Sequence, residues 1–172
     1  MKKIWWIIGG ITLLAAGTMT TLTITNITDK LPKGKGAYLK RPLSKIKYIV
    51  VHHSAIDGYG ATDYAKWHIA RGWPGIGYHY VIDPDGKVNQ TNSLDTVSNH
   101  VKNTNTASIG ISLSGNLSKH PPTAAQMDSL VKLIKKIKKE VGNQLLVKGH
   151  GELQPTECPG KMTDMNKIRS LT

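Results

Sequence analysis

The sequence predicts a single α/β domain with a central mixed β-sheet flanked by helices. Three apolar runs have the length of buried strands, at residues 46–54, 108–114 and 145–150. Between the second and third runs, apolar residues recur at helical spacing from Met127 to Val141. The alternation of strand and helix patterns is what predicts the α/β class. At 172 residues, the chain is long enough to bury one core.

The shorter elements follow from local signals. Residues 62–71 are expected to form a helix, because the pattern is helical and Gly72 follows it. Residues 77–82 and 87–91 are predicted to be two strands of a hairpin, since Pro84-Asp85-Gly86 between them favours a turn.

The long helix is expected to begin at a capping box, in which Thr123 pairs with Gln126. Residues 164–170 predict a short last helix. The outer face of the long helix carries Lys132, Lys135, Lys136, Lys138 and Lys139. This face fits contact with an anionic wall polymer, although a solvated helix surface is the more frequent explanation of such a pattern.

Residues 1–28 predict a signal-anchor or signal peptide helix. Lys2 and Lys3 precede an uncharged stretch from Ile4 to Thr28, and about 20 residues suffice to cross a bilayer. The two lysines favour a cytoplasmic start, which places the rest of the chain on the outer side of the cytoplasmic membrane. A cleaved signal ending near Gly17 is the alternative. The protein is therefore predicted to be exported, and anchored in the membrane at least transiently.

Residues 29–45 are predicted to be a basic linker, and residues 46–172 the catalytic domain. Prolines and glycines interrupt any periodicity in the linker, and its charge is mostly positive. It fits a tether lying against anionic phosphates or wall polymer, and it also fits a solvated spacer. The formal net charge of the whole chain is +12, which favours an anionic partner such as nucleic acid, anionic lipid or an acidic wall polymer.

His52, His150 and Cys158 form the most informative set of residues. Each histidine follows an apolar run, so both are expected at the carboxyl ends of buried strands. Cys158 comes shortly after His150, across a segment with prolines that can turn back. Two imidazoles and one thiolate leave one position of a tetrahedral zinc ion open, as in a catalytic site. Since Cys158 is the single cysteine, no internal disulfide competes for it.

The sequence around these residues resembles one known family. The matching blocks, in order, are Val50-Val51-His52-His53-Ser54-Ala55, Trp67-His68 with Gly72 to Ile82, Asp85-Gly86, Asn99-His100 with Asn105 and Ser108-Ile109-Gly110-Ile111, and Gly149-His150 with Cys158-Pro159-Gly160. From Lys47 onward the chain resembles the zinc-dependent N-acetylmuramoyl-L-alanine amidases. This superfamily includes amidase-type phage lysozymes and the peptidoglycan recognition proteins.

The resemblance implies a peptidoglycan hydrolase with one catalytic Zn²⁺, held by His52, His150 and Cys158. The bond cleaved would be the amide between N-acetylmuramic acid and L-alanine of the stem peptide. Tyr78 matches the family tyrosine beside the metal, and Thr156 falls where relatives carry a catalytic lysine or threonine. His100 and Trp73 are expected to contact substrate.

One departure from the family pattern concerns the general base. Part of the family carries a glutamate after Ile-Gly-Ile, whereas this chain has Ser112 there. The chain therefore resembles the branch that relies on tyrosine. Glu152 and Glu157 flank the ligand loop and are candidate proton shuttles, although exposed loop carboxylates are the more common explanation.

The other histidines are expected to play structural roles. His53 follows His52 directly, and successive strand side chains point to opposite faces, so only one of them can reach the metal. The family match selects His52. His68 and His79 are expected to satisfy hydrogen bonds in or near the core.

Several functions are compatible with these features. A phage endolysin and a host wall-remodelling amidase both fit, and the small size favours the endolysin. A non-catalytic peptidoglycan-binding module is disfavoured, because such relatives typically lack the cysteine ligand. A nucleic-acid binder would explain the charge but neither the paired histidines nor the membrane segment. The expected partners are therefore peptidoglycan, the membrane and an anionic wall polymer, with no nucleic acid.

Overall fold

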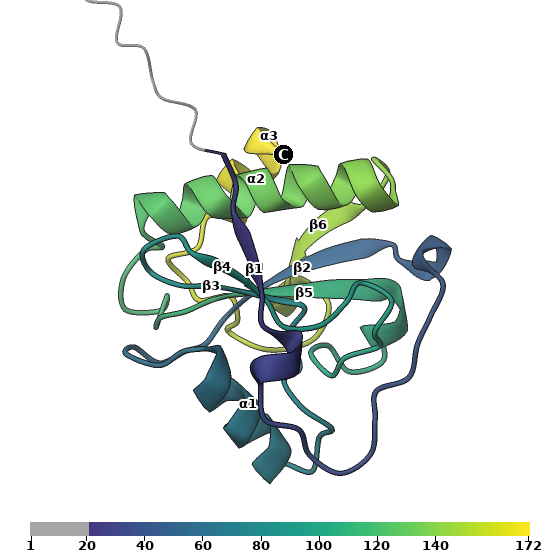
Figure 1. The fold of residues 1–172 in the computed structure, drawn as a ribbon. Coiled ribbons are helices and arrows are strands. Elements are labelled where there is room, and N and C mark those ends of the chain that lie inside the picture. The colour runs from purple at the N-terminus through teal and green to yellow at the C-terminus, as the bar shows by residue number, and fades with distance from the viewer. Residues whose placement is uncertain (1–20) are drawn as a thin grey trace, which may run out of the picture.

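A computed structural model describes residues 21–172, which form one α/β domain around a mixed sheet (Figure 1). In these residues the sheet has six strands in the order β1-β4-β3-β5-β2-β6. The strands are β1 (Ile24–Asn26), β2 (Tyr48–His53), β3 (Tyr80–Ile82), β4 (Val88–Gln90), β5 (Ser108–Leu113) and β6 (Leu146–Gly149). The helices are α1 (Ala61–Ala70), α2 (Ala124–Val141) and α3 (Met165–Leu171).

The sheet is mixed because one hairpin joins an otherwise parallel arrangement. Strand β2 pairs in parallel with β5 and β6, and β3 pairs in parallel with β5. Strands β3 and β4 are antiparallel, as the turn at residues 84–86 predicted. The carboxyl ends of β2 and β6 consequently meet at one edge of the sheet, where two of the predicted metal ligands lie.

Helices cover both faces of the sheet (Figure 1). On one face, Ile49 and Val51 of β2 join a core with Leu130 and Ile134 of α2. On the other face, α1 packs with Val81 in a smaller core. Since side chains alternate along a strand, His52 projects away from the core that holds Ile49 and Val51.

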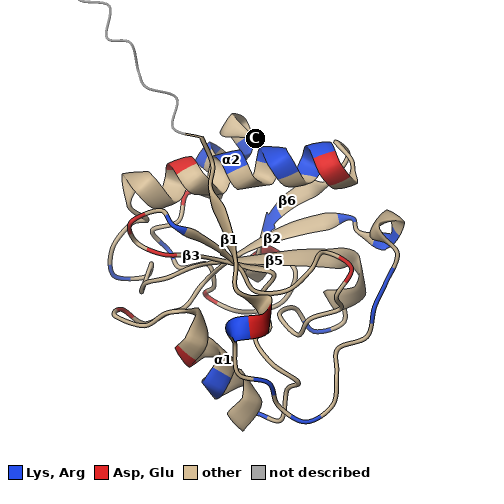
Figure 2. Ribbon diagram, in the orientation of Figure 1, with Lys and Arg blue, Asp and Glu red and all other residues tan. Residues whose placement is uncertain are grey.

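Helix α2 begins as predicted. The Thr123 hydroxyl accepts a hydrogen bond from the Gln126 amide, and the Gln126 side chain accepts one from the Thr123 amide. Its outward face is strongly basic (Figure 2), and Lys135, Lys136 and Lys139 are exposed there.

The predicted boundary of the amino-terminal helix is wrong. Ile24–Asn26, which the uncharged stretch placed in a helix, form strand β1 and pair in parallel with β4. The backbone N–H and C=O groups of an uncharged run can form their hydrogen bonds with a partner strand as well as within a helix. Here the partner, β4, is distant in sequence, so the run alone does not reveal it. The rest of the predicted helix, residues 1–20, lies outside the described residues. Within residues 21–172, no helix is both long enough and apolar enough to cross a bilayer.

The predicted spacer over residues 29–45 is also packed on the domain. Leu31 is buried in the core beside α1. Arg41 is 5% exposed, and its guanidinium donates to the carbonyl oxygens of Leu94 at 3.1 Å and Ser108 at 2.8 Å. Those carbonyls accept hydrogen bonds from one terminal nitrogen of the guanidinium inside the protein, while Nε of Arg41 is buried without a partner among the described residues. This part of the chain therefore belongs to the domain.

Candidate metal centre and catalytic cavity

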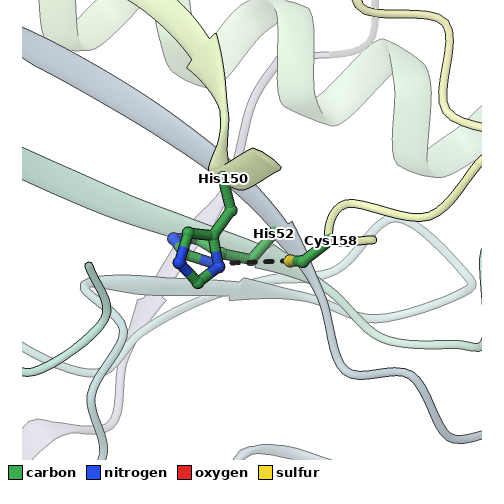
Figure 3. A group of neighbouring side chains, drawn as sticks. All are labelled: His52, His150 and Cys158. Atoms are coloured by element: carbon green, nitrogen blue, oxygen red, sulfur yellow. Dashed lines mark hydrogen bonds between the residues drawn. The ribbon is translucent and has the colours of Figure 1, made fainter. Parts of the chain in front are cut away.

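His52 and His150 lie side by side because of the register between β2 and β6. Val51 pairs with Gly149, so the next residue on each strand is a histidine. His150 begins a single 3-10 turn, His150–Glu152, and the chain then loops back. The Gly151 amide donates to the Cys158 carbonyl at 2.7 Å, which closes the loop and returns the thiol to the histidines (Figure 3).

The three side chains have the spacing of a zinc site. Their candidate ligand atoms all lie within 4.8 Å of one another. Nδ1 of His52 is 3.6 Å from Sγ of Cys158. A zinc ion bound tetrahedrally at about 2.3 Å from sulfur and about 2.0–2.1 Å from nitrogen would hold those atoms about 3.6 Å apart. Nε2 of His150 is buried and has no hydrogen-bond partner among the described residues, as expected of an atom reserved for a ligand.

Burial keeps both histidines neutral, as metal ligands must be. Desolvation lowers the pKa of His52 well below its usual value, and neighbouring histidines lower it further. Desolvation also lowers the pKa of His150. Burial raises the pKa of the Cys158 thiol to about 11, so without a metal the sulfur stays protonated. Metal binding must therefore displace the thiol proton.

The ligand cluster opens into a cavity of about 460 Å³. His68, Trp73 and Tyr78 form an aromatic wall of this cavity. The ring centres of His68 and Trp73 lie 4.7 Å apart, and the Tyr78 ring packs against His68. The cavity is also lined by Arg71 and, on the side of Cys158, by Thr156 and Glu157. It combines a metal-ligand set with room for a substrate, which is the default arrangement of an active site.

Tyr78 lies in the irregular segment that leads into β3, whereas the sequence predicted a strand from residue 77 onward. Its ring centre is 5.3 Å from that of His52. The backbone is fixed because its carbonyl accepts hydrogen bonds from Thr91 and Asn92. Burial raises the pKa of the Tyr78 hydroxyl above its usual value, so the group is a proton-bearing donor at neutral pH.

Comparison with known proteins agrees with this geometry. Residues 42–161 match the family model described as N-acetylmuramoyl-L-alanine amidase. The chain belongs to this family. An endolysin of Klebsiella phage KP32 is 34% identical over 119 residues, which are 64% of this chain and 78% of the relative. Peptidoglycan-recognition protein SC2 of Drosophila melanogaster is 30% identical over 162 residues and covers 87% of each chain.

Solved structures confirm the fold of this amidase. The endolysin amidase LysCS from Clostridium intestinale superposes with a TM-score of 0.76 at 27% identity, covering 86% of this chain and 93% of that one. The Ph2119 endolysin from a Thermus scotoductus bacteriophage superposes with a TM-score of 0.75 at 27% identity, covering 87% and 98%.

The other predicted site residues of the amidase take different positions. Thr156 is exposed at the cavity, and its hydroxyl accepts a hydrogen bond from the Cys158 amide at 3.3 Å. Trp73 lines the cavity, where a substrate can reach it. His100 also borders the cavity but is only 8% exposed, and its Nδ1 lies 3.0 Å from Nε2 of His52. His100 therefore stands behind a candidate metal ligand, a place that does not fit the expected substrate contact.

The two candidate proton shuttles, Glu152 and Glu157, differ in their contacts. Glu152 accepts a hydrogen bond from the Gly149 amide at 2.6 Å and pairs with Arg169, so it serves the turn that carries His150. Glu157 lines the cavity, and within residues 21–172 it forms no hydrogen bond or ion pair through its side chain. Only Glu157 remains available as a proton shuttle.

The remaining histidines lie where the sequence placed them. His53 points away from the ligand set, and its Nδ1 accepts a hydrogen bond from the Leu117 amide. His68 accepts one from the Gly77 amide. His79 is fully buried, with Nδ1 accepting from the Gly110 amide and Nε2 against the Thr96 carbonyl.

Sequence reasoning missed Arg71, Ser108 and the role of Gly110. Arg71 follows α1 and carries no motif of its own, so only its place in the cavity singles it out. Ser108 and Gly110 belong to a matching block, but their contacts with His100 depend on how the loop before β5 folds back against that strand.

Proposed function

We propose that this amidase is a zinc-dependent peptidoglycan hydrolase that cleaves the amide between N-acetylmuramic acid and L-alanine. The observation that carries the proposal is the set of His52, His150 and Cys158, which has zinc spacing and opens into a cavity. Three protein ligands leave a coordination position for catalysis, whereas a structural zinc site is closed by four. A non-catalytic binding module would not need this set.

The residues around the cavity divide the work of amide hydrolysis. A zinc ion bound at the three ligands supplies a Lewis acid and lowers the pKa of water. Tyr78, held protonated by burial, donates a hydrogen bond to the oxygen that gains charge as the carbonyl is attacked. The Thr156 hydroxyl stands on the Cys158 side of the same space and can add a second donor.

A proton must also move from the attacking water to the leaving amine. Among the residues that line the cavity, Glu157 alone has a carboxylate. We assign this transfer to Glu157, because Ser112 replaces the glutamate used by other relatives and its buried hydroxyl cannot act as a base at neutral pH.

The test is hydrolysis of purified cell walls by the full chain, with and without a chelator. We expect new amino-terminal L-alanine to appear, to stop after chelation and to return with added zinc. Release of reducing sugar ends in place of free amino groups would contradict the proposed bond.

Arg71 is proposed to bind a carboxylate of the stem peptide. It is the one arginine or lysine that lines the cavity, and within residues 21–172 its guanidinium forms no ion pair or hydrogen bond. A stem peptide carries free carboxylates, and amidation converts a carboxylate into a neutral carboxamide. A guanidinium prefers the carboxylate, because charge-assisted hydrogen bonds are the stronger ones.

Substitution of Arg71 should therefore change substrate preference. For stem peptides with a free carboxylate, Arg71→Gln is expected to raise KM roughly tenfold or more, since a hydrogen bond to a charged group contributes about 1.5–3 kcal/mol. For amidated peptides KM should change little. Arg71→Lys should give an intermediate value, because lysine keeps the charge without the planar fork. Equal effects on both substrates would contradict the assignment.

The biological setting is proposed from the relatives and the charge. The endolysin relatives favour a lysis enzyme over a host wall-remodelling enzyme. Export through an amino-terminal signal or anchor would bring the domain to its substrate outside the cytoplasmic membrane. The formal charge of +12 and the exposed lysines of α2 support attraction to anionic wall polymer or lipid.

Fractionation of cells expressing the full chain tests this setting. A membrane-bound pool of uncleaved length supports an anchor, and a promptly shortened soluble form supports a cleaved signal. In the second case we expect the mature chain to begin before Ile24, because a later cut would remove strand β1 from the sheet. A full-length pool confined to the cytoplasm would contradict export.

A further inference from the structure

A chain of buried hydrogen bonds leads away from His52 on the side opposite the metal position. Nδ1 of His52 faces Cys158, while its Nε2 lies 3.0 Å from Nδ1 of His100. Nε2 of His100 lies 3.2 Å from the hydroxyl of Ser108, which in turn lies 2.8 Å from the Thr104 carbonyl oxygen. His52, His100 and Ser108 are all buried, at 1%, 8% and 0% exposure.

The last group in this chain determines where every proton lies. A carbonyl oxygen only accepts, so the Ser108 hydroxyl must donate to Thr104. That hydroxyl then receives a hydrogen bond from Nε2 of His100, which must carry the proton. In a neutral imidazole the other nitrogen is bare, so Nδ1 of His100 accepts from Nε2 of His52. Nδ1 of His52 is left bare and faces the metal position.

Two further features hold His100 in this orientation. The Asn105 side chain accepts hydrogen bonds from the amides of His100 and Val101, at 2.9 Å and 2.8 Å. The His100 ring lies against Gly110 of β5, where a Cβ atom would stand 2.8 Å from Cγ and Nδ1 of the ring. The glycine in the Ile109-Gly110-Ile111 block therefore makes room for the imidazole.

We propose that Ser108 and His100 are positioning residues that set the tautomer of the ligand His52. Three hydrogen bonds transmit the polarity of the Thr104 carbonyl to Nδ1 of His52. The fixed tautomer presents a lone pair to zinc without a cost for moving a proton. Partners of this kind behind a metal ligand typically contribute about 10–100-fold in metal affinity. The inference rests on the proposed zinc site.

The tautomer itself can be observed in the full chain after zinc is removed. Long-range ¹H–¹⁵N spectra distinguish the two neutral forms of each histidine. We expect His52 to carry its proton on Nε2 in the zinc-free wild type, and both tautomers to be populated in Ser108→Ala. A zinc-free wild type with the proton on Nδ1 of His52 would overturn the proposal.

Zinc affinity, measured by competition with a chelator, gives the second readout. Ser108→Ala is expected to bind zinc about tenfold more weakly or worse. The matched control is Ser98→Ala, because Ser98 is equally buried and lies 3.3 Å from Nδ1 of His79, which is not a ligand. The control should leave zinc affinity unchanged. Equal losses in the two variants would mean a general packing effect and would also overturn the proposal.

Substitutions of His100 distinguish the contribution of its hydrogen-bond acceptor, Nδ1, from the contribution of the imidazole ring as a whole. The amide oxygen of His100→Asn can take the place of Nδ1, whereas His100→Ala provides no acceptor. We therefore expect the asparagine variant to retain more zinc affinity than the alanine variant, and equal losses to contradict the role of the acceptor. If the wild type bound no zinc, the proposed function would fail. If it bound zinc with Ser108→Ala unaffected, only the tautomer relay would fail.

Discussion

Cys158→Ser is expected to abolish hydrolysis of cell walls, with a loss of about 10³-fold or more. The substitution removes the thiolate from a three-ligand site, and a metal contributes several kcal/mol to stabilising charge in the transition state. Each tenfold in rate corresponds to about 1.36 kcal/mol. A serine hydroxyl is a poor substitute, because it does not ionise near neutral pH. The measurement is release of amino-terminal L-alanine from purified walls.

Zinc-dependent stability checks that the loss comes from the metal. A ligand at 100 times its Kd stabilises the folded state by about 2.7 kcal/mol, so zinc should raise the Tm of the wild type and leave that of Cys158→Ser nearly unchanged. The matched control is His120→Ala, since His120 is an exposed histidine that pairs with Asp57 and does not line the cavity. Wild-type turnover by zinc-free Cys158→Ser would exclude the mechanism.

Tyr78→Phe is expected to reduce turnover by about 10²–10³-fold with zinc still bound. The substitution keeps the aromatic ring beside His52 and His68 but removes the hydroxyl, and the loss of one oxyanion donor has this size. Because the donor acts mainly in the transition state, kcat should fall far more than KM rises.

A second tyrosine provides the control for that experiment. Tyr59 is 46% exposed and its ring packs on Trp67, so Tyr59→Phe removes a hydroxyl outside the residues that line the cavity. It should leave turnover unchanged. If Tyr78→Phe were equally active, Tyr78 would be a packing residue, and Thr156 would become the remaining candidate donor.

The candidate metal ligands could be predicted from the sequence because each lies at a position that local rules describe. His52 is the last residue but one of strand β2 and His150 directly follows strand β6, and the alternation of strand side chains removes His53 from consideration. The matching blocks then connect these strands with Cys158. The structure confirms the proximity of all three.

The role of His100 could not be predicted in the same way. Its motif indicates a place near the active site. A histidine can either contact the substrate or support a metal ligand, so the residue type does not distinguish these two roles. The decision depends on Gly110, which lets the ring lie against β5, and on the Thr104 carbonyl, which orders the protons. Both contacts lie within residues 100–110, but the place of His100 behind the candidate ligand depends on its contact with His52, which is distant along the chain.

In residues 21–45, too, local sequence patterns left open what tertiary contacts decide. Uncharged residues such as Ile24–Asn26 fit a membrane helix or a strand, and only the pairing with β4 decides between them. Arg41 lies among prolines and glycines that suggest a linker, yet carbonyls from distant segments bury it.

The sequence by itself therefore determined the α/β class, the long helix, the family and the three candidate metal ligands, since these depend on periodicity and on residue types at strand ends. Tertiary structure alone decided the edge strand, the packed linker, the carboxylate available in the cavity and the hydrogen bonds behind His52. Most of those depend on a partner that is far away along the chain, and a polar group is satisfied or left free only by what the fold brings next to it.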